Sequence, residues 1–228
     1  YHTHMDIVLH AAEFAAEAHR DQRRKNILAA PYINHPIGVA RILTDTGCIN
    51  PSIIAAALLH DVVEDTDRTI EDIRAAFGSK IAGIVAEVTD DRSPASTKYD
   101  RKRRQIESAP TKSWEAKSVK AADKLHNLTD LVACPPPGWS VDYMHEYFAH
   151  AHAVLVGMGY GQDGFGNREL EARLRRLFET AQIQTPEGPV YALPQTADER
   201  LAAVSRFLGG ADVPAPPMII MSEGAEMH

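Results

Sequence analysis

The sequence predicts an all-α fold, a bundle of about eight to ten helices. Its dominant apolar pattern has the spacing of three and four residues that marks one face of a helix. No segment alternates between apolar and polar residues as a half-buried strand does. With 228 residues, of which 44% are hydrophobic, the chain can close one core of ordinary size. The first helix carries this pattern in Ile7, Ala11, Phe14, Ala15 and Ala18.

The next two helices are predicted from prolines, which suit the first turn of a helix. One helix begins at Pro36 and ends before Gly47, and another begins at Pro51 and continues through an apolar run to Asp61. Because a residue before proline avoids the α region, we expect His35 to form a rigid entry to its helix. The further helices are expected at about 69–77, 79–90, 98–108, 115–133, 140–158 and 167–180.

Clusters of glycine and proline mark the breaks between these helices. They fall at Gly47–Pro51, Asp91–Pro94, Pro135–Gly138 and the glycine-rich stretch Gly157–Gly166. The character of the chain changes after about residue 185. We therefore expect one main domain over residues 6–181 and a C-terminal appendage over 186–228. In the appendage, Ala197–Leu208 could form one more helix before a proline-rich tail.

The charge distribution limits the partners of the protein. A formal net charge of −7 argues against binding nucleic acid through a basic surface. The basic residues nevertheless form two clusters, at 20–25 and 98–104, which fit either local capture of an anion or two solvated helix ends.

Neither a membrane span nor a secretory segment is recognisable in the sequence. Two distant cysteines, Cys48 and Cys134, indicate reduced thiols rather than a disulfide framework. These features predict a cytoplasmic protein. The sequence leaves the oligomeric state open.

The most informative segment is His60-Asp61-Val62-Val63-Glu64-Asp65. A His-Asp pair at the end of an apolar helix is costly to bury unless a partner such as a divalent cation compensates it. Glu64 follows His60 by four residues and Asp65 follows Asp61 by four, so each pair shares one face of a helix. A single turn could therefore present two metal ligands and two further carboxylates to one cavity.

Two more candidate ligands lie elsewhere in the chain. His35 stands at a helix entry, and Asp123 lies in a strongly helical stretch with Asn127 four residues later on the same face. Together with His60 and Asp61 they form a set of two histidines and two aspartates. Such a set is compatible with Mn²⁺, Fe²⁺, Co²⁺ or Zn²⁺, and ligand type does not choose among them.

Three motifs in order along the chain carry a family resemblance. They are Tyr32-Ile-Asn-His-Pro-Ile-Gly-Val-Ala40, Ala57-Leu-Leu-His-Asp-Val-Val-Glu-Asp-Thr66 and Lys120-Ala-Ala-Asp-Lys-Leu-His-Asn-Leu128. The set resembles the hydrolase domain of the RelA/SpoT family. With no synthetase domain following, the chain is most similar to the stand-alone animal form, the small alarmone hydrolases also called metazoan SpoT homologs. The resemblance covers roughly residues 6–181.

This resemblance implies an HD-domain helical fold with one Mn²⁺ per chain, held by His35, His60, Asp61 and Asp123. It implies that Glu64 and Asp65 handle the water nucleophile, and that Arg24, Lys25 and Asn127 contact the nucleoside. The implied enzyme is a phosphoric ester hydrolase that cleaves guanosine 3′,5′-bis(diphosphate), ppGpp, to GDP and diphosphate. A role in the stringent or starvation response follows from the same resemblance.

The role of several other residues is open at the level of sequence. Of the second basic cluster, Lys98 and Arg101 are the better candidates for holding phosphates because they precede a helix that could return toward the site. Tyr147 could stack on a base or, as we favour, pack in the core. We expect surface positions for His145, His150 and His152, and a direction away from Asn127 for His126.

Three alternative functions remain. The same cavity could remove the 2′-phosphate of NADPH, since both substrates present a phosphate ester on a ribose beside a purine. A nucleotide sensor without catalysis would need a broken set of ligands or carboxylates, whereas every assigned position is filled. A helical interaction module would leave the acid-rich cluster unexplained, although residues 186–228 could add such a role.

Overall fold

The computed structural model describes residues 4–90, 93 and 95–214. Part of the predicted break at 91–94 and the tail beyond 214 lie outside the described residues. The described helices and strands follow in chain order: α1 (His4–Ala18), α2 (Asn34–Asp45), α3 (Pro51–Leu59), α4 (Val62–Asp65), α5 (Ile70–Val88), α6 (Lys98–Ser108), a 3₁₀ turn (Ala109–Thr111), α7 (Trp114–Ala133), α8 (Val141–Gly157), α9 (Arg168–Thr180), β1 (Gln182–Thr185), β2 (Gly188–Tyr191) and α10 (Ala197–Phe207).

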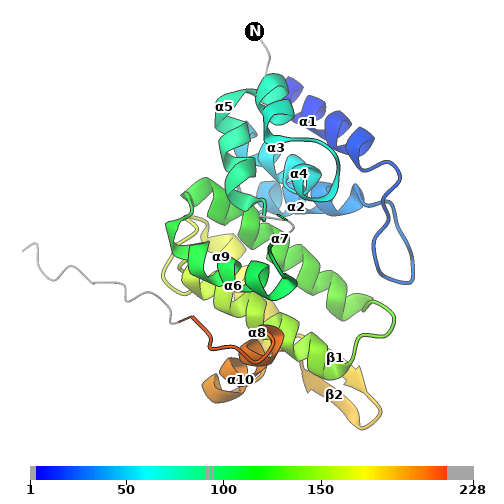
Figure 1. Ribbon diagram of the computed structural model, residues 1–228, viewed down its shortest axis with the longest axis vertical. Coiled ribbons are helices and arrows are strands. Elements are labelled where there is room, and N and C mark those ends of the chain that lie inside the picture. The colour runs from blue at the N-terminus through cyan, green and yellow to red at the C-terminus, as the bar shows by residue number, and fades with distance from the viewer. Residues whose placement is uncertain (1–3, 91–92, 94, 215–228) are drawn as a thin grey trace, which may run out of the picture.

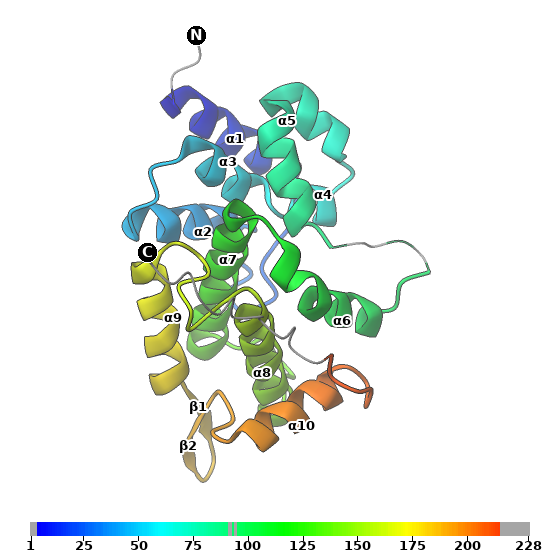
Figure 2. The same ribbon diagram turned by 90° about the vertical axis from the view of Figure 1, so that its left-hand side faces the viewer.

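The helices form two groups that share the long helix α7 (Figures 1 and 2). In the first group α3 packs against α1, α2 and α5, and α7 contacts α2, α3 and α5. In the second group α7 contacts α8 and α9, while α8 contacts α6 and α10. The core is continuous through both groups and includes the fully buried Leu43, Leu59, Leu128 and Phe148. The all-α prediction is confirmed.

Polar residues fix where the helices begin. The side chain of Asn50 accepts from the backbone N–H of Ser52 at the start of α3, where Pro51 occupies the first helical position. Thr69 and Thr97 form reciprocal capping boxes with Asp72 and Asp100, which start α5 and α6. These caps satisfy backbone donors that a helix start otherwise leaves unpaired.

Two helix boundaries, one near His35 and one near His60, differ from the prediction. His35 lies inside α2, which begins at Asn34, so its backbone is helical and the expected non-helical entry is wrong. Pro36 is tolerated there because the first turn of a helix has no intrahelical partner for its missing N–H. Helix α3 ends at Leu59, and the chain bends at His60 and Asp61 before the single turn of α4.

Gly78 accounts for the two helices predicted between residues 69 and 90. The segment Ile70–Val88 carries a kink at Gly78, whose φ of 83° is in the left-handed region. Glycine adopts this conformation without a steric penalty, so two helical pieces follow each other at an angle.

The C-terminal segment contains strands that the sequence pattern does not reveal. β1 and β2 pair antiparallel, with Ile183 opposite Val190, and each strand has only four residues. Four residues are too few for a clear alternation, which is why this hairpin was not predicted. The predicted helix at 197–208 is confirmed as α10, which packs against α8 rather than standing apart.

None of the described helices is both long and apolar enough to cross a lipid bilayer. The two cysteines, both half-buried, are free thiols in the structure.

Candidate metal centre and nucleotide cavity

Three segments bring two histidines and two aspartates together. His35 comes from α2, His60 and Asp61 from the bend after α3, and Asp123 from α7. The His35 Nε2 atom lies 3.1 Å from Asp123 Oδ1 and 3.5 Å from Asp61 Oδ2. The His60 Nε2 atom lies 3.0 Å from Asp61 Oδ2 and 3.6 Å from Asp123 Oδ1. All four predicted ligands therefore surround one point.

The arrangement fits a divalent metal ion. Donor atoms of His35, His60 and Asp123 lie within 4.8 Å of one another. Both Nε2 atoms are buried, and neither has a hydrogen-bond partner among the described residues, although the carboxylates are close. Buried polar atoms are rarely left in this state, and a cation between the rings and carboxylates would satisfy them. The site is a divalent metal site of mixed nitrogen and oxygen donors.

Charge coupling among these groups supports the same conclusion. Burial favours the neutral form of His60, yet Asp61 and Asp123 raise its pKa well above the ordinary histidine value. Burial would raise the pKa of Asp123, but His35 and His60 lower it far below its usual range. The carboxylates thus stay ionised and attract positive charge, which a metal ion supplies when the rings are neutral.

Two residues that the sequence did not single out hold the ligands. The Tyr32 hydroxyl donates to Asp61 Oδ2 at 2.6 Å. The Nδ1 atoms of His126 and His35 are 2.9 Å apart, so one of the two rings donates to the other. His126 was expected only to face another side of its helix than Asn127, and its contact with His35 was not predicted. Burial and His35 lower the pKa of His126 to about 4, which keeps this ring neutral.

Gly38 is the position that admits His126. A Cβ atom at Gly38 would lie 2.1 Å from His126 Nε2 and 2.4 Å from its Cδ2, far inside van der Waals contact. The glycine in the motif His-Pro-Ile-Gly is thus required by the close approach of a ring from α7.

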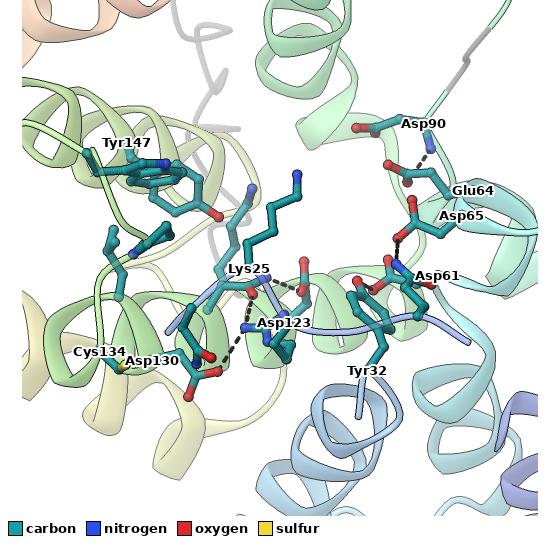
Figure 3. Close-up of a pocket in the computed structure, with 18 of the residues that line it drawn as sticks. Lys25, Tyr32, Asp61, Glu64, Asp65, Asp90, Asp123, Asp130, Cys134 and Tyr147 are labelled. Atoms are coloured by element: carbon teal, nitrogen blue, oxygen red, sulfur yellow. Dashed lines mark hydrogen bonds and ion pairs between the residues drawn. The ribbon is translucent and has the colours of Figure 1, made fainter. Parts of the chain in front are cut away.

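The metal cluster opens into a cavity of about 490 Å³. Figure 3 shows Asp61, Glu64, Asp65 and Asp90 at one end, Asp123 near the middle and Tyr147 at the opposite end. The cavity wall combines three kinds of side chain: acidic Asp61, Glu64, Asp65, Asp90, Asp123 and Asp130; basic Arg23, Arg24, Lys25, Lys102, Lys120 and Lys124; and aromatic Tyr32, Trp139, Tyr143, Tyr147 and Phe207.

The two predicted catalytic carboxylates line the acidic end. Glu64 Oε2 accepts from the backbone N–H of Asp90 at 3.2 Å, and Asp65 Oδ2 accepts from Gln22 Nε2 at 3.3 Å. Burial, and then the neighbouring charge of Asp90, raise the pKa of Glu64. A carboxylate with a raised pKa is a better proton acceptor than an ordinary glutamate.

Lys120 and Lys124 are buried on α7 beside the acidic end. The Lys120 ammonium donates to the carbonyl oxygen of Val88 at 3.0 Å, and the Lys124 ammonium donates to Gln105 Oε1 at 3.3 Å. Burial tends to lower the pKa of Lys120, but Asp90 and Asp123 raise it above its ordinary value. From the motif around these lysines the sequence predicted only Asp123 as a metal ligand, because lysines at helical spacing do not by themselves indicate a site.

The predicted substrate-binding residues fall into two groups. Arg24, Lys25 and Asn127 line the cavity, and Arg24 Nη2 donates to Asn127 Oδ1 at 3.1 Å and to Asp130 Oδ2 at 2.8 Å. Lys98 and Arg101 do not line it; Arg101 instead donates to the carbonyl oxygen of Ser96 and lines a separate hollow. From the same helix, Lys102 reaches the cavity.

Tyr147 packs against the core, as was favoured, and also lines the cavity. The expectation for His150 is wrong: it is 4% exposed and its Nε2 lies 2.9 Å from the carbonyl oxygen of Lys102, so it is not a surface residue of α8. This difference arises because α6 and α10 cover the side of α8 that the helix pattern alone leaves open.

Comparison with known proteins identifies relatives of the part of the chain that contains His35, His60, Asp61 and Asp123. The HD domain family matches residues 11–149. The guanosine-3′,5′-bis(diphosphate) 3′-pyrophosphohydrolases MESH1 of Mus musculus and Homo sapiens are each 50% identical to this chain over 173 residues, covering 75% of it and 93% of the relative.

A solved structure described as a metazoan ortholog of SpoT that hydrolyzes ppGpp and plays a role in starvation responses is also similar. It has a TM-score of 0.69 and 42% identity, and the match covers 76% of this chain and 94% of that chain.

Proposed function

Because the chain belongs to the HD domain family and is 50% identical to relatives named as ppGpp hydrolases, we propose that it is a metal-dependent ppGpp 3′-pyrophosphohydrolase. It converts ppGpp and water to GDP and diphosphate, and is therefore a hydrolase of phosphoric esters. The observation that carries the proposal is the pair of buried, unpartnered Nε2 atoms of His35 and His60, aimed at Asp61 and Asp123 on the cavity wall.

Four residues would hold the metal: His35, His60, Asp61 and Asp123. We expect Mn²⁺, as the resemblance to the hydrolase domain of the RelA/SpoT family implies. When bound, a divalent ion lowers the pKa of water and neutralises negative charge on phosphate oxygens. Tyr32 and His126 orient Asp61 and His35 respectively through the contacts described above.

Glu64 is placed to take the proton of the attacking water at a carboxylate oxygen. Its backbone contact with Asp90 fixes the side chain, and its raised pKa makes it a better proton acceptor than an ordinary glutamate. Asp65 lies beside it on the same turn, where it orients the water. The water oxygen bonds to the phosphorus that is attached to the ribose 3′-oxygen, and the bond between that phosphorus and the 3′-oxygen breaks. The proton is passed to the 3′-oxygen, which leaves as the hydroxyl group of GDP, and diphosphate is released.

The cations of the cavity oppose the charge of the substrate. Lys120 and Lys124 interact with the charge of Asp123, Arg24 donates to Asn127, and Lys25 lines the same cavity. Ammonium and guanidinium groups form strong charge-assisted hydrogen bonds with phosphate oxygens. Because the acidic end concentrates negative charge, these cations allow an anionic substrate to approach it. Lys98 and Arg101 remain proposed phosphate contacts that would require their side chains to turn toward the cavity.

The hydrolase domain is proposed to span residues 6–181, with 186–228 as an added segment. A cytoplasmic location and NADPH 2′-phosphatase activity stay predictions from the sequence. The relatives described above are named for ppGpp.

The direct test is product analysis with ppGpp. The protein is stripped of metal with a chelator, and GDP and diphosphate are measured with and without added Mn²⁺. Metal-dependent formation of both products in equal amounts supports the proposal. An NADPH reaction run in parallel with the same preparation measures release of phosphate and NADH. Turnover of NADPH without turnover of ppGpp would replace the proposed substrate.

A further inference from the structure

The last residue of α10 lies on the wall of the nucleotide cavity. Phe207 lines the cavity, although it is 4% exposed. Its ring centroid lies 5.6 Å from that of Tyr143 and 6.1 Å from that of Tyr147, both on α8. Trp139 extends this cluster, with its ring 4.6 Å from Tyr143 and perpendicular to it. An aromatic wall from two separate segments thus closes one end of the cavity.

Phe207 also holds the ammonium group of Lys102, a residue of α6, at the cavity. The ammonium of Lys102 lies 3.1 Å from the centroid of the Phe207 ring and donates to the Phe207 carbonyl oxygen at 3.3 Å. The same ammonium lies 5.6 Å from the centroid of Tyr143. A cation over an aromatic face is attracted by the ring quadrupole, so Phe207 determines where the Lys102 charge stands.

The end of α10 is fixed on both neighbouring helices. On the α8 side, Arg206 Nε donates to Glu146 Oε1 at 3.1 Å. On the α6 side, Arg103 Nη2 donates to the carbonyl oxygen of Asp212 at 2.6 Å. The chain turns back between these contacts at Gly209 and Gly210, with φ values of 77° and 85°. Phe207 is therefore held in place by bonds before and after it.

This wall stands at the end of the cavity away from Glu64 and Asp65 (Figure 3). Figure 3 shows Tyr147 across the pocket from Glu64 and Asp65. A nucleotide whose 3′-pyrophosphate meets the metal cluster would point its purine toward the aromatic end. Aromatic rings stack on nucleobases, and a neighbouring cation adds to this attraction.

The segment that carries Phe207 lies outside the matched family region. The HD domain match ends at residue 149, and the 173 residues aligned with the mouse relative cover 93% of that protein but 75% of this chain. Phe207 thus comes from a segment that the family match does not include.

We propose that the C-terminal segment is part of the substrate site, in which Phe207 positions Tyr143 and Lys102 to bind the nucleoside end of the substrate. The proposal rests on the proposed function for the identity of the nucleotide. Phe207 is a positioning residue, because most of its surface is covered by the groups that it holds. Its replacement should therefore weaken binding of ligands with a purine and leave the metal end unchanged.

The test compares Phe207→Ala and Phe207→Leu with the wild type in the full chain loaded with Mn²⁺. Leucine keeps the apolar packing and removes only the ring, so it serves if the alanine variant fails to fold. Leu201→Ala is the matched control, because Leu201 lies on α10 but is 56% exposed and does not line the cavity. Calorimetry measures the Kd of GDP and of inorganic diphosphate, kinetics gives KM and kcat for ppGpp, and thermal unfolding gives Tm.

For Phe207→Leu we expect the Kd of GDP and the KM of ppGpp to rise about tenfold, equivalent to about 1.4 kcal/mol. The Kd of diphosphate and kcat should change less than about twofold, a difference too small to involve a lost contact. Leu201→Ala should match the wild type.

An unchanged Kd of GDP in both Phe207 variants would overturn the inference, and so would an equal weakening of GDP and diphosphate, which indicates general loosening. A wild-type chain that binds GDP but does not hydrolyse ppGpp would contradict the proposed function alone, since the GDP comparison still decides the role of Phe207.

Discussion

The Nδ1 atom of His60 lies 2.7 Å from the carbonyl oxygen of Ala57, one turn earlier in the chain. A carbonyl oxygen only accepts, so Nδ1 carries a proton and donates it. When the ring is neutral, as a metal ligand must be, its lone pair is therefore on Nε2, which faces Asp61 and Asp123. The backbone of α3 thus sets the tautomer that a metal ligand requires.

Replacing His60 or Asp61 by alanine should remove metal and activity together. Each change deletes a proposed ligand and leaves the remaining charges uncompensated, so we expect substoichiometric metal and a loss of ppGpp hydrolysis above about 100-fold. Metal content by elemental analysis and product formation check this. The exposed His10→Ala is the control for loss of a histidine. Retention of one metal per chain by His60→Ala would remove it from the ligand set.

Glu64→Gln should keep the metal and lose turnover. The amide occupies the same volume but cannot accept the proton, so kcat should fall about 10²-fold or more. The exposed Asp67→Asn, in the same segment, controls for loss of one negative charge. Full kcat in Glu64→Gln, with metal bound, would contradict its role as proton acceptor.

The double variant Arg24→Ala, Lys25→Ala should raise the KM of ppGpp more than it lowers kcat. Both residues line the cavity, where Arg24 donates to Asn127, and we expect them to act on binding more than on bond cleavage. Steady-state kinetics gives the two constants. Arg20→Ala is the matched control, since the Arg20 side chain is 73% exposed and outside the cavity. A loss confined to kcat would move Arg24 and Lys25 into the reaction itself.

Activity should decline as the pH rises through about 8 because of Lys102. Burial, and then the charge of Lys98, lower the pKa of Lys102 to about 8. A lysine is cationic below its pKa, so its attraction for the bound nucleotide is present at pH 7 and is lost above pH 8. The kcat/KM profile reports ionisation of the free enzyme and should show this limb.

In Lys102→Arg the limb should disappear, because a guanidinium stays charged over this range. Lys98→Met is a second check. It removes the neighbouring positive charge that helps to lower the pKa, so the limb should move to higher pH. The same limb in Lys102→Arg as in the wild type would assign it to another group.

Gly38→Ala should weaken metal binding without touching a ligand. The added methyl group would collide with the His126 ring and displace it from His35. We expect a loss of stability of about 1–3 kcal/mol, the usual effect of overpacking, and a weaker affinity for Mn²⁺. Gly83→Ala is the control, because nothing lies within 4 Å of its Cβ position on α5. Equal metal affinity in the two variants would show that His126 does not support His35.

Thermal unfolding of the two glycine variants separates stability from binding. In Gly83→Ala the free energy of unfolding should rise by up to about 1 kcal/mol, because alanine favours a helix more than glycine does.

The four proposed ligands were predictable because their residue types and order are unusual. His60 and Asp61 at the end of an apolar helix need compensation, and the helix entry at Pro36 and the helical stretch around Asp123 offered His35 and Asp123 as further ligands. Tyr32 and His126 were not predicted as supporting residues, because nothing in their spacing distinguishes them from ordinary core or surface positions. Their roles depend on contacts between α2, α3 and α7, which only the folded chain brings together.

The basic cluster at 98–104 is a second case in which the sequence did not predict which side chains reach the cavity. The sequence indicated that a cluster at 98–104 could meet phosphates, but the structure turns Lys102 to the cavity and leaves Lys98 and Arg101 off its wall. Successive residues on a helix point about 100° apart, so a choice among neighbours depends on how the helix is rotated about its axis. That rotation is set by packing of α6 against α8, which the local sequence does not encode.

By itself the sequence determined the helical fold, most helix boundaries and the metal-binding residue types, because helix periodicity, capping and ligand chemistry are local properties. The tertiary structure decided which side chains complete the site. Phe207 shows this most clearly: it lies 58 residues after the end of the family match at residue 149, yet it lines the cavity. Such a contact arises from packing of α10 on α8, and packing is fixed by the whole chain rather than by any segment.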